Sequence, residues 1–518
     1  MKNKSFLNGA FILAAAGIIS KFIGFFFKVP ITRLIGAEGL GLYNYPYNLY
    51  SAMLAISITG LPVAISKLVS ERIALKQYRA VHKVFKVALI LMSFVGISTS
   101  AVLFVGSKII VNKFWPPGAY YPLMGLVFAP IFVASMSVFR GYFQGMQLMM
   151  PTAISQIFES FGRLIVGLGL AYFLVNKGIP YAAGGASFGA TAGAILGLIV
   201  LIISYLKIHS KLNKNIQKYK VIEKEESSIF IITKILSISV PISIGAVASS
   251  MMSLIDSLMI NSRLLIAGFS VKEASVLYGQ LGAANTLINF PLTVSIAIAA
   301  SIVPVISEAK VHENYYEIRQ KLEEGIKMGF YIGLPATMGL FILADPILAF
   351  IFPTINGGGK LLQLLAVALV FITLNQILTG ALQGFGKVMI PVKNLFLGSV
   401  VKVIVSYFLT IQPAYNIKGA AIGTITGYII ALLLNYKDIK KYTKIKLKVN
   451  DIFIKPIVSV IGMSLAVFYT FNYWSGVLNS NNIATLISIL AGAIVYGTIL
   501  LCVGGIKIKD VLMIFNRK

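Results

Sequence analysis

The segment RGYFQGMQLMMP (residues 140–151) decides the architecture, because a related segment, TGALQGFGKVMIP (379–391), follows later in the chain. A second pair of segments matches at a similar separation: GGASFGATAG (184–193) and KGAAIGTITG (418–427). Two shorter pairs, LPVAIS with VPVIS and RLIGA with RLLIAG, recur at comparable offsets. The chain therefore contains two related halves.

Composition indicates that both halves lie in a membrane. Of 518 residues, 57% are hydrophobic and only 12% are charged, whereas a soluble domain has about 25% charged residues. Apolar runs of about twenty residues recur, each long enough to cross roughly 30 Å of hydrocarbon, and they are continuous rather than alternating, unlike β-barrel strands. We predict an all-α polytopic protein with about fourteen spans, near residues 7–29, 41–66, 84–106, 122–143, 152–175, 182–206, 230–262, 275–305, 325–349, 361–384, 391–411, 418–436, 453–473 and 483–505.

The repeat assigns these spans to three parts. Six spans per half is an even number, so both halves enter the membrane in the same direction and are related by an axis along the membrane normal, as in transporters with parallel repeats. The glycine stripes of both halves are interpreted as close-packing faces rather than hinges. The predicted parts are a first lobe (1–226), a second lobe (227–445) and two additional spans with a tail (446–518).

The net charge of +28 would suggest nucleic acid as the partner of a soluble protein. Here most of the excess lies in short loops, with roughly 30 Lys and Arg on one side against about 8 on the other. We therefore predict no nucleic-acid partner, a bacterial cytoplasmic membrane location, and both termini in the cytoplasm. The first apolar segment continues to Val29 and is interpreted as a retained span, not a cleaved signal. The basic loops 207–226 and 437–448 fit attraction to anionic lipid heads, with partner docking as the alternative.

The first span carries charges at membrane depth. Gly17, Lys21, Gly24 and Lys28 are spaced four, three and four residues apart, so they share one helix face. Small and cationic residues on one face suit a wall of a water-filled cavity, because a charge facing lipid is costly. Lys21 is deep and is predicted to face this cavity. Lys28 lies nearer the end, where snorkelling to the interface explains it equally well.

Further charges recur in both halves. Pro30 is predicted to bend or end the first helix, which leaves Arg33 near the external mouth. Arg163 and Lys402 lie at equivalent depth after Pro151 and Pro391, respectively. An ion pair with Glu159, four residues before it, is the structural alternative for Arg163.

Asp256 is the clearest acidic residue inside a span. It is either a counter-ion for Lys402 or Arg163, or a site for a coupling cation, and both interpretations remain open. With Glu159 it is outnumbered by the cations, so the predicted cavity is net positive and selects an anionic substrate. A potential that is negative inside also drives anions outward, by roughly 2.3 kcal/mol per charge per 100 mV.

The segment 20–71, with GAEGLGLY and GLPVAISKLVSE as its most specific parts, resembles the stage V sporulation protein B family of polysaccharide-biosynthesis-type transporters. That family is related to MurJ-type lipid II flippases. The resemblance implies two six-helix bundles around a central cavity and a lipid-tail groove at the last two helices. It also implies alternating access that moves an undecaprenyl-pyrophosphate-linked glycan precursor to the outer leaflet, for spore cortex peptidoglycan in the sporulation branch. Lys21 stands where those flippases have a cavity arginine, whereas Phe27 and Thr286 replace two others.

Three other functions make different demands on the sequence. A multidrug antiporter of the same superfamily needs exposed carboxylates in its lobes. A membrane glycosyltransferase needs catalytic acids or metal ligands, and the external loops are short. A scaffold for the cell-wall synthesis machinery needs no charges in a cavity, although that machinery remains a candidate partner. With one cysteine, Cys502, and three loop histidines, no disulfide, metal site, cofactor or catalytic residue is expected.

Overall fold

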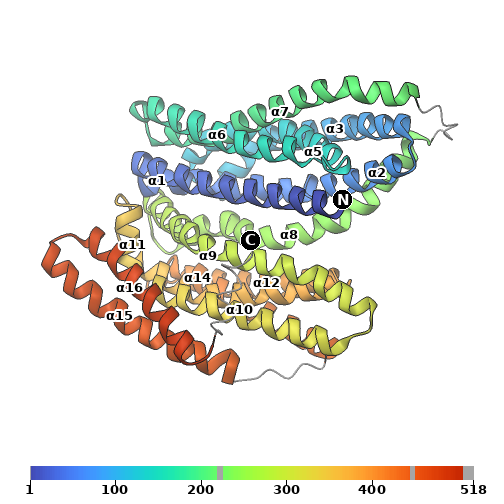
Figure 1. The fold of residues 1–518 in the computed structure, drawn as a ribbon. Helices are drawn as coiled ribbons and strands as arrows, with labels where there is room; N and C mark the ends of the chain where they lie inside the picture. Colours follow the sequence, from blue (N-terminus) through green and yellow to red (C-terminus); the bar gives the residue numbers. More distant parts are fainter. Residues whose placement is uncertain (1, 219–225, 444–449, 506–518) are drawn as a thin grey trace. The chain divides into compact units, whose positions relative to one another are not determined.

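The computed structural model describes residues 2–218, 226–443 and 450–505, which are almost entirely helical, so the all-α prediction is confirmed (Figure 1). Within these ranges thirteen stretches are long and apolar enough to span a membrane. The α-helices are α1 (Lys2–Ser57), α2 (Leu61–Ala74), α3 (Tyr78–Phe114), α4 (Tyr120–Leu126), α5 (Ala129–Gly145), α6 (Met149–Leu174), α7 (Ile179–Lys218), α8 (Ser228–Ile266), α9 (Val271–Val311), α10 (Tyr315–Ile342), α11 (Ala344–Ile351), α12 (Gly359–Gly384), α13 (Met389–Thr410), α14 (Lys418–Thr443), α15 (Lys455–Leu478) and α16 (Asn481–Cys502).

Helix α1 consists of two arms that meet at Gly36. This residue has non-helical angles, φ 67° and ψ −172°. The ring centroids of Phe27 and Tyr43 lie 6.3 Å apart, although a straight helix of that length would separate them by about 24 Å. The chain therefore reverses at Gly36. The first candidate stretch, Ala15–Ala74, thus holds two crossings, which brings the total from thirteen to the predicted fourteen.

The predicted ends of the first two spans need correction. Helix α1 continues through Pro30, which lies inside it, so this proline does not end the helix. Membrane helices tolerate proline because neighbouring groups satisfy the carbonyl that loses its donor. The span predicted over 41–66 is also interrupted, since α1 ends at Ser57 and α2 begins at Leu61.

The reversal at Gly36 predicts a specific cost of substitution. Its φ and ψ belong to a region that is essentially restricted to glycine, and a Cβ there would meet nothing within 4 Å. Gly36→Ala should therefore lower the free energy of unfolding by about 1–2 kcal/mol through the backbone alone. Thermal unfolding in detergent measures this, with Gly17→Ala as the control because a Cβ at Gly17 also meets open space. Equal transition temperatures for the two variants would contradict it.

The first compact unit comprises residues 1–262 and 270–279. Within it, α5, α6 and α7 lie side by side (Figure 1). A Cβ on Gly189 of α7 would lie 2.7 Å from the carbonyl oxygen of Arg163, and one on Gly193 would overlap that of Glu159. The glycine stripe is therefore a close-packing face, as predicted, and it covers the backbone of α6 beside these two charged residues.

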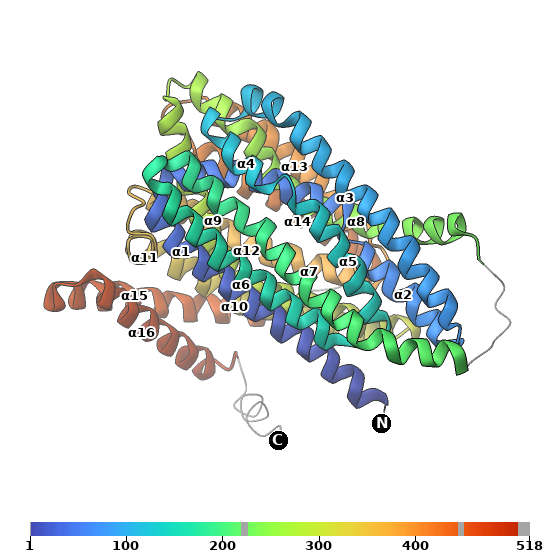
Figure 2. The same cartoon turned by 90° about the horizontal axis from the view of Figure 1, so that it is seen from above.

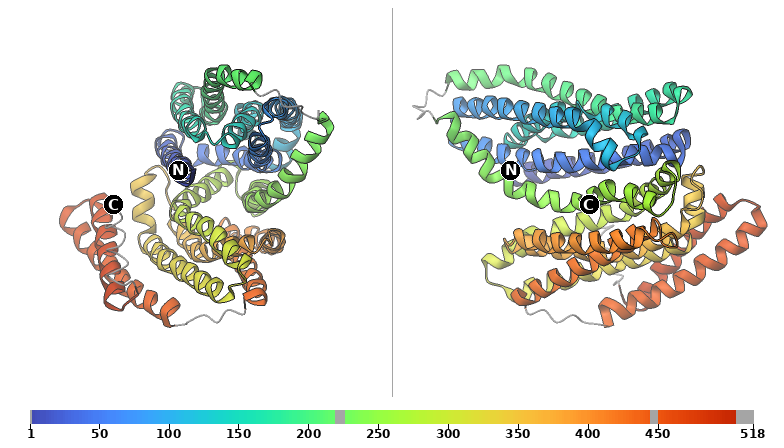
Figure 3. Two further views of the ribbon diagram at one scale, coloured as in Figure 1. Left: turned by 45° about the vertical axis from the view of Figure 1, so that its right-hand side comes forward. Right: turned by 180° about the vertical axis from the view of Figure 1, so that it is seen from behind.

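The second compact unit comprises residues 263–269 and 280–518. Helices α12, α13 and α14 are joined by buried asparagines: Asn394 donates to the Asn435 side chain at 2.9 Å, and Asn435 donates to that of Asn375 at 2.8 Å. The second glycine stripe packs α14 on α13, since a Cβ on Gly423 would lie 3.0 Å from the carbonyl oxygen of Lys402. The two additional helices, α15 and α16, lie side by side (Figure 2; Figure 3).

Contacts place α8 differently from the sequence repeat. The repeat assigns residues 227–262 to the second lobe, whereas they belong by contacts to the first unit. Ser257 of α8 donates to the Tyr45 carbonyl oxygen at 2.7 Å, and its own carbonyl accepts from Trp115 Nε1 at 2.7 Å. The predicted boundary at residue 226 therefore follows the sequence duplication. As a boundary between two structural lobes it remains a prediction.

The backbone itself carries the duplication. Left-handed residues end corresponding helices in both halves: Lys76 and Glu313, Gln147 and Gly386, Gly178 and Asn416. Members of each pair are separated by 237, 239 and 238 positions, respectively. Since left-handed residues are uncommon and mark helix ends, their recurrence at one offset confirms the internal repeat.

Candidate functional site

The first arm of α1 presents an open face around Lys21. The Lys21 side chain is exposed, and a Cβ on Gly17 or Gly24 would meet no atom within 4 Å. The apolar side chain of Phe26, on the same arm, is also exposed (62%). The predicted stripe therefore exists as a face with space in front of it. That this space is the substrate cavity remains a prediction.

Lys28, one turn beyond Gly24, is partly buried rather than open. Its positive charge acts on that of Arg163 on α6. Phe27 beside it is 2% exposed, and its ring lies against Gly167 of α6. The stripe is therefore open at Lys21 but lies close to α6 at Lys28. Lys28 and Arg163, two of the predicted cations, are near enough to interact electrostatically.

Arg163 bridges α6 and the second arm of α1. Its Nη1 donates to the Tyr47 hydroxyl at 2.9 Å, and its guanidinium carbon lies 5.8 Å from the centroid of that ring. Its Nη2 is 3.9 Å from Glu159 Oε1, so the predicted i,i+4 ion pair is present but long. The planar guanidinium of Arg163 carries more N–H donors than Tyr47 and Glu159 use, so the remaining N–H groups can bind an anion.

Glu159 has a second and closer partner in Arg140 of α5. Arg140 Nη2 lies 2.8 Å from Glu159 Oε2, and its Nε donates to the Ser155 hydroxyl at 3.1 Å. One carboxylate is therefore shared by two arginines. The side chains of all three are only 17–24% exposed.

Lys28, Tyr47, Arg140, Glu159 and Arg163 form what we call the cationic cluster. Three positive charges and one negative charge leave it with a formal excess of two. Excess positive charge in a half-buried site is favourable only when an anion or water neutralises it. The cluster can therefore hold a phosphate or a similar anion through charge-assisted hydrogen bonds.

The remaining predicted residues lie apart from one another along the chain. Arg33 is exposed on α1, three residues before the reversal. Asp256 of α8 is 5% exposed and acts electrostatically on Tyr278, which accepts a hydrogen bond from Asn48 at 2.9 Å. Lys402 of α13, in the second unit, is 1% exposed. Roles for these three in substrate binding or ion coupling stay predictions.

Sequence reasoning missed Arg140 and Tyr47. Tyr43, Tyr47 and Tyr50 recur at spacings of four and three, a stripe on one helix face that could have marked the second arm of α1. Tyr43 and Tyr47 are stacked at 5.3 Å. Arg140 opens the repeated segment itself, but no spacing within α5 points to its partner on α6. Among the described residues, no group of three or more His, Cys, Asp or Glu side chains could hold a metal ion.

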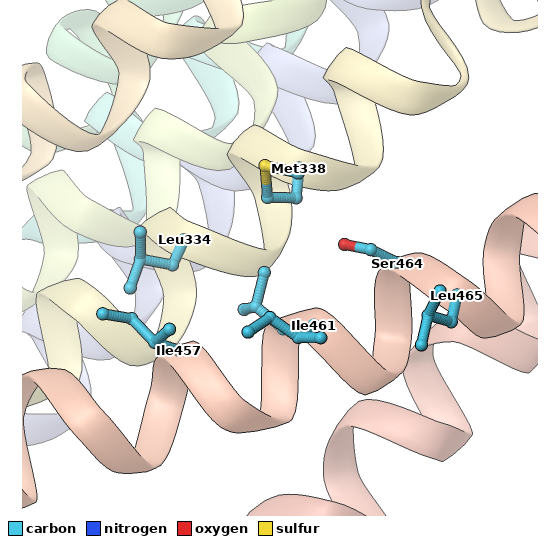
Figure 4. A pocket seen from close by; sticks show the side chains of 7 residues that line it. Leu334, Met338, Ile457, Ile461, Ser464 and Leu465 are labelled. Carbon is cyan, nitrogen blue, oxygen red and sulfur yellow. The ribbon is translucent and has the colours of Figure 1, made fainter.

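An apolar cavity of about 390 Å³ lies in the second unit, between α10 and α15 (Figure 4). Leu334 and Met338 line it from α10, and Ile457, Ile461, Ser464 and Leu465 line it from α15. This volume is within the range of small-molecule sites, about 300–1,000 Å³. The first of the two additional helices therefore borders an apolar space, whereas α16 does not line it.

A family model described as polysaccharide biosynthesis protein matches residues 6–310. The chain belongs to this family. A second model, MatE, matches residues 241–408. Among curated proteins of Bacillus subtilis (strain 168), stage V sporulation protein B is 28% identical over 87% of this chain and 86% of its own length. Lipid II flippase MurJ from the same organism is 24% identical over 94% of both chains.

Solved structures of the same fold extend the family comparison. An inward closed lipid II flippase MurJ matches with a TM-score of 0.70 at 16% identity, covering 94% of this chain and 98% of that one. An inward-facing multidrug resistance MATE family transporter of the MOP superfamily matches with a TM-score of 0.66 at 16% identity, over 81% of this chain and 95% of that one. This chain is thus a multi-pass membrane protein with the fold of flippases and exporters.

Proposed function

We propose that the chain flips an anionic, undecaprenyl-pyrophosphate-linked glycan precursor from the inner to the outer leaflet of the bacterial cytoplasmic membrane by alternating access. The cationic cluster is the observation that carries the proposal. Its excess of two positive charges, held by Lys28, Arg140 and Arg163, matches a pyrophosphate. The lipid II flippase among its relatives supports a lipid-linked substrate, and the sporulation protein supports a role in spore cortex peptidoglycan.

The mechanism follows from where each group lies. Lys21, on the open face of α1, attracts the anionic head group, and the cluster then holds it through N–H donors from α1, α5 and α6. Glu159 keeps both guanidinium groups in place and limits their mutual repulsion. The membrane potential favours outward movement of the bound anion. With both termini in the cytoplasm, the more basic loops face the negative side of that potential.

The direct test is transport in proteoliposomes made with the purified full-length chain. A fluorescent undecaprenyl-pyrophosphate-linked glycan is incorporated, and the fraction reached by a membrane-impermeant quencher is followed over time. We expect the chain to raise the flipping rate at least tenfold over protein-free vesicles. A rate equal to that of protein-free vesicles, with folded protein present in the bilayer, would falsify the proposal.

An organic-cation antiporter is the second candidate, because the MatE model matches residues 241–408. A cation carrier needs carboxylates that are available to its substrate, yet Glu159 is already shared by Arg140 and Arg163. Asp256 is the remaining candidate carboxylate, and it is buried.

Neutralising both acids separates the two functions. We expect the double variant Glu159→Gln and Asp256→Asn to flip the glycan lipid more slowly than the unchanged chain but still faster than protein-free vesicles. The amide of glutamine still accepts a hydrogen bond from Arg140, but it no longer offsets the repulsion between the two guanidinium groups. An antiporter would instead lose ethidium efflux in the same variant. Parallel measurements of flipping and efflux in proteoliposomes decide the matter: efflux by the wild type that disappears in the variant supports the antiporter.

A further inference from the structure

The last turn of α8 carries an arginine that lies over a tyrosine of α13. The guanidinium carbon of Arg263 is 4.0 Å from the ring centroid of Tyr407, and both residues belong to the second unit. The Arg263 carbonyl accepts a hydrogen bond from the Ala267 backbone N–H at 3.0 Å, and a turn with a left-handed residue, Gly268 (φ 93°), follows the helix. Arg263 therefore lies where α8 ends, next to the last turns of α13.

The guanidinium of Arg263 has N–H donors that no described residue uses. Arginine carries five N–H donors. In the described part of the chain no carboxylate pairs with Arg263, and its buried Nε has no hydrogen-bond partner. Every residue within seven positions of Arg263 or Tyr407 is described, and Asp256, about 10 Å earlier along α8, is the only carboxylate among them. A partly buried cation with unused donors favours an anionic acceptor from outside the chain.

The side chains next to Arg263 and Tyr407 mark this place as a membrane surface. Ile266 on α8, and Ile404 and Phe408 on α13, are exposed apolar residues. With both termini in the cytoplasm, as the loop charges predict, α8 and α13 both end on the outer side. Arg263 then lies where the apolar surface meets the outer head-group layer, whose anions are lipid phosphates.

The first half of the chain has an arginine at the corresponding position. Arg33 and Arg263 open the paired segments RLIGA and RLLIAG, and each precedes a glycine with positive φ, Gly36 and Gly268, respectively. The dipole of a helix favours a cation near its C-terminus in either half. The second half adds the ring of Tyr407, which fixes the position of the guanidinium.

We propose that Arg263, held by Tyr407, binds the phosphate of a lipid on the outer side of the membrane. The tyrosine ring takes the face of the guanidinium, so the N–H groups in its plane can donate to two phosphate oxygens at once. The chain of the same lipid covers Ile266 and Phe408. The lipid is either a phospholipid of the membrane or the carrier after it has crossed; this second source rests on the proposed flippase function.

The location favours a lipid phosphate over a soluble anion. A phosphate that is attached to a lipid is concentrated in the head-group layer, and its chain removes exposed apolar side chains from water, which a soluble anion cannot do. By contacts the cationic cluster belongs to the first unit, whereas Arg263 and Tyr407 belong to the second. Arg263 is therefore a phosphate site additional to that cluster.

A tryptophan in place of Tyr407 reports lipid binding at the site itself. Tryptophan keeps an aromatic face for the guanidinium, and Tyr407 is 40% exposed, so the larger ring has room. Full-length Tyr407→Trp is reconstituted into vesicles with brominated phosphatidylglycerol or with brominated glucosyl diacylglycerol, which lacks phosphate. The unsubstituted chain supplies the background of its two native tryptophans. We expect quenching at position 407 to show about a fivefold preference for the phospholipid.

Charge variants in the Tyr407→Trp background identify the group responsible. Arg263→Gln should lower the preference to about onefold, and Arg263→Lys, which keeps the charge but loses the planar fork, should give an intermediate value. Lys360→Gln is the matched control and should leave the preference unchanged. Lys360 is an exposed cation of the second unit at the start of α12, an end that the predicted topology also places outside.

Competition identifies the source of the phosphate. Undecaprenyl pyrophosphate is added to the vesicles with brominated phosphatidylglycerol, and undecaprenol, which has the same chain without phosphate, serves as the control. Relief of quenching by the pyrophosphate alone assigns the site to the carrier. Unchanged quenching with both additions assigns it to a membrane phospholipid.

Four outcomes would overturn the proposal: equal quenching by both brominated lipids at position 407, a preference that survives Arg263→Gln, an equal loss in Lys360→Gln, and relief by undecaprenol as strong as that by the pyrophosphate. If Tyr407→Trp does not fold, Phe408→Trp at the neighbouring exposed position is the second reporter. These readouts need no transport, so a failure of this proposal is distinguishable from a failure of the proposed flippase function.

Discussion

A chain that carries Arg163→Gln should flip its lipid-linked substrate about 10- to 100-fold more slowly than the unchanged protein. Arg163 is the member of the cationic cluster that joins α6 to α1, through its 2.9 Å hydrogen bond to Tyr47. A hydrogen bond to a charged group contributes about 1.5–3 kcal/mol, which corresponds to that range of rates when it is made to the bound anion. The measurement is the initial flipping rate in proteoliposomes at equal protein content.

Two companion variants separate charge from geometry. Arg163→Lys keeps the charge but loses the planar fork, so we expect an intermediate rate. Tyr47→Phe removes the hydroxyl that positions the guanidinium and keeps the ring, so its loss should be less than tenfold. If Arg163→Gln flips at the wild-type rate while it remains folded, the cationic cluster is not the substrate site. A flippase that uses Lys21 and other groups would then be the remaining possibility.

Parts of this site were predictable from sequence because they follow from periodicity along one helix. The spacing of Gly17, Lys21 and Gly24 gave a common face, and the structure has open space in front of both glycines. The separation of four residues between Glu159 and Arg163 likewise predicted their ion pair, which is present at 3.9 Å. Helical geometry alone decides such relations.

Contacts between helices were not predictable in the same way. Arg140 and Glu159 are 19 residues apart and meet only because α5 packs against α6. Tyr47 reaches Arg163 across 116 residues, and only because the chain reverses at Gly36. The sequence predicted that the first helix bends or ends at Pro30. The helix instead continues through this proline, which membrane helices tolerate, and the chain reverses at Gly36. A single sequence shows which faces exist; it does not show which faces meet.

Replacing Gly279 by valine should have the largest effect on stability, about 3 kcal/mol or more. Within the first unit, a Cβ on Gly279 would overlap the carbonyl oxygen of Ala37, and one on Gly41 would overlap that of Ser275. Backbone atoms cannot rotate away as side chains can, so the helices must separate, and the cost reaches the upper end of overpacking. Thermal unfolding in detergent, followed by size-exclusion chromatography, measures the loss.

Gly24→Val is the matched control, because a Cβ there meets nothing within 4 Å. It introduces the same β-branched residue into α1, the helix whose second arm approaches Gly279 of α9, so the difference between the two variants reports the close approach of the two backbones. Equal unfolding temperatures would show that the two backbones do not pack this closely. The second arm of α1 carries Ala37 and Gly41 and, less than two turns further on, Tyr47. Separating that arm from α9 should therefore also shift the Tyr47 hydroxyl from Arg163, and we expect the folded fraction of Gly279→Val to flip more slowly than the unchanged chain.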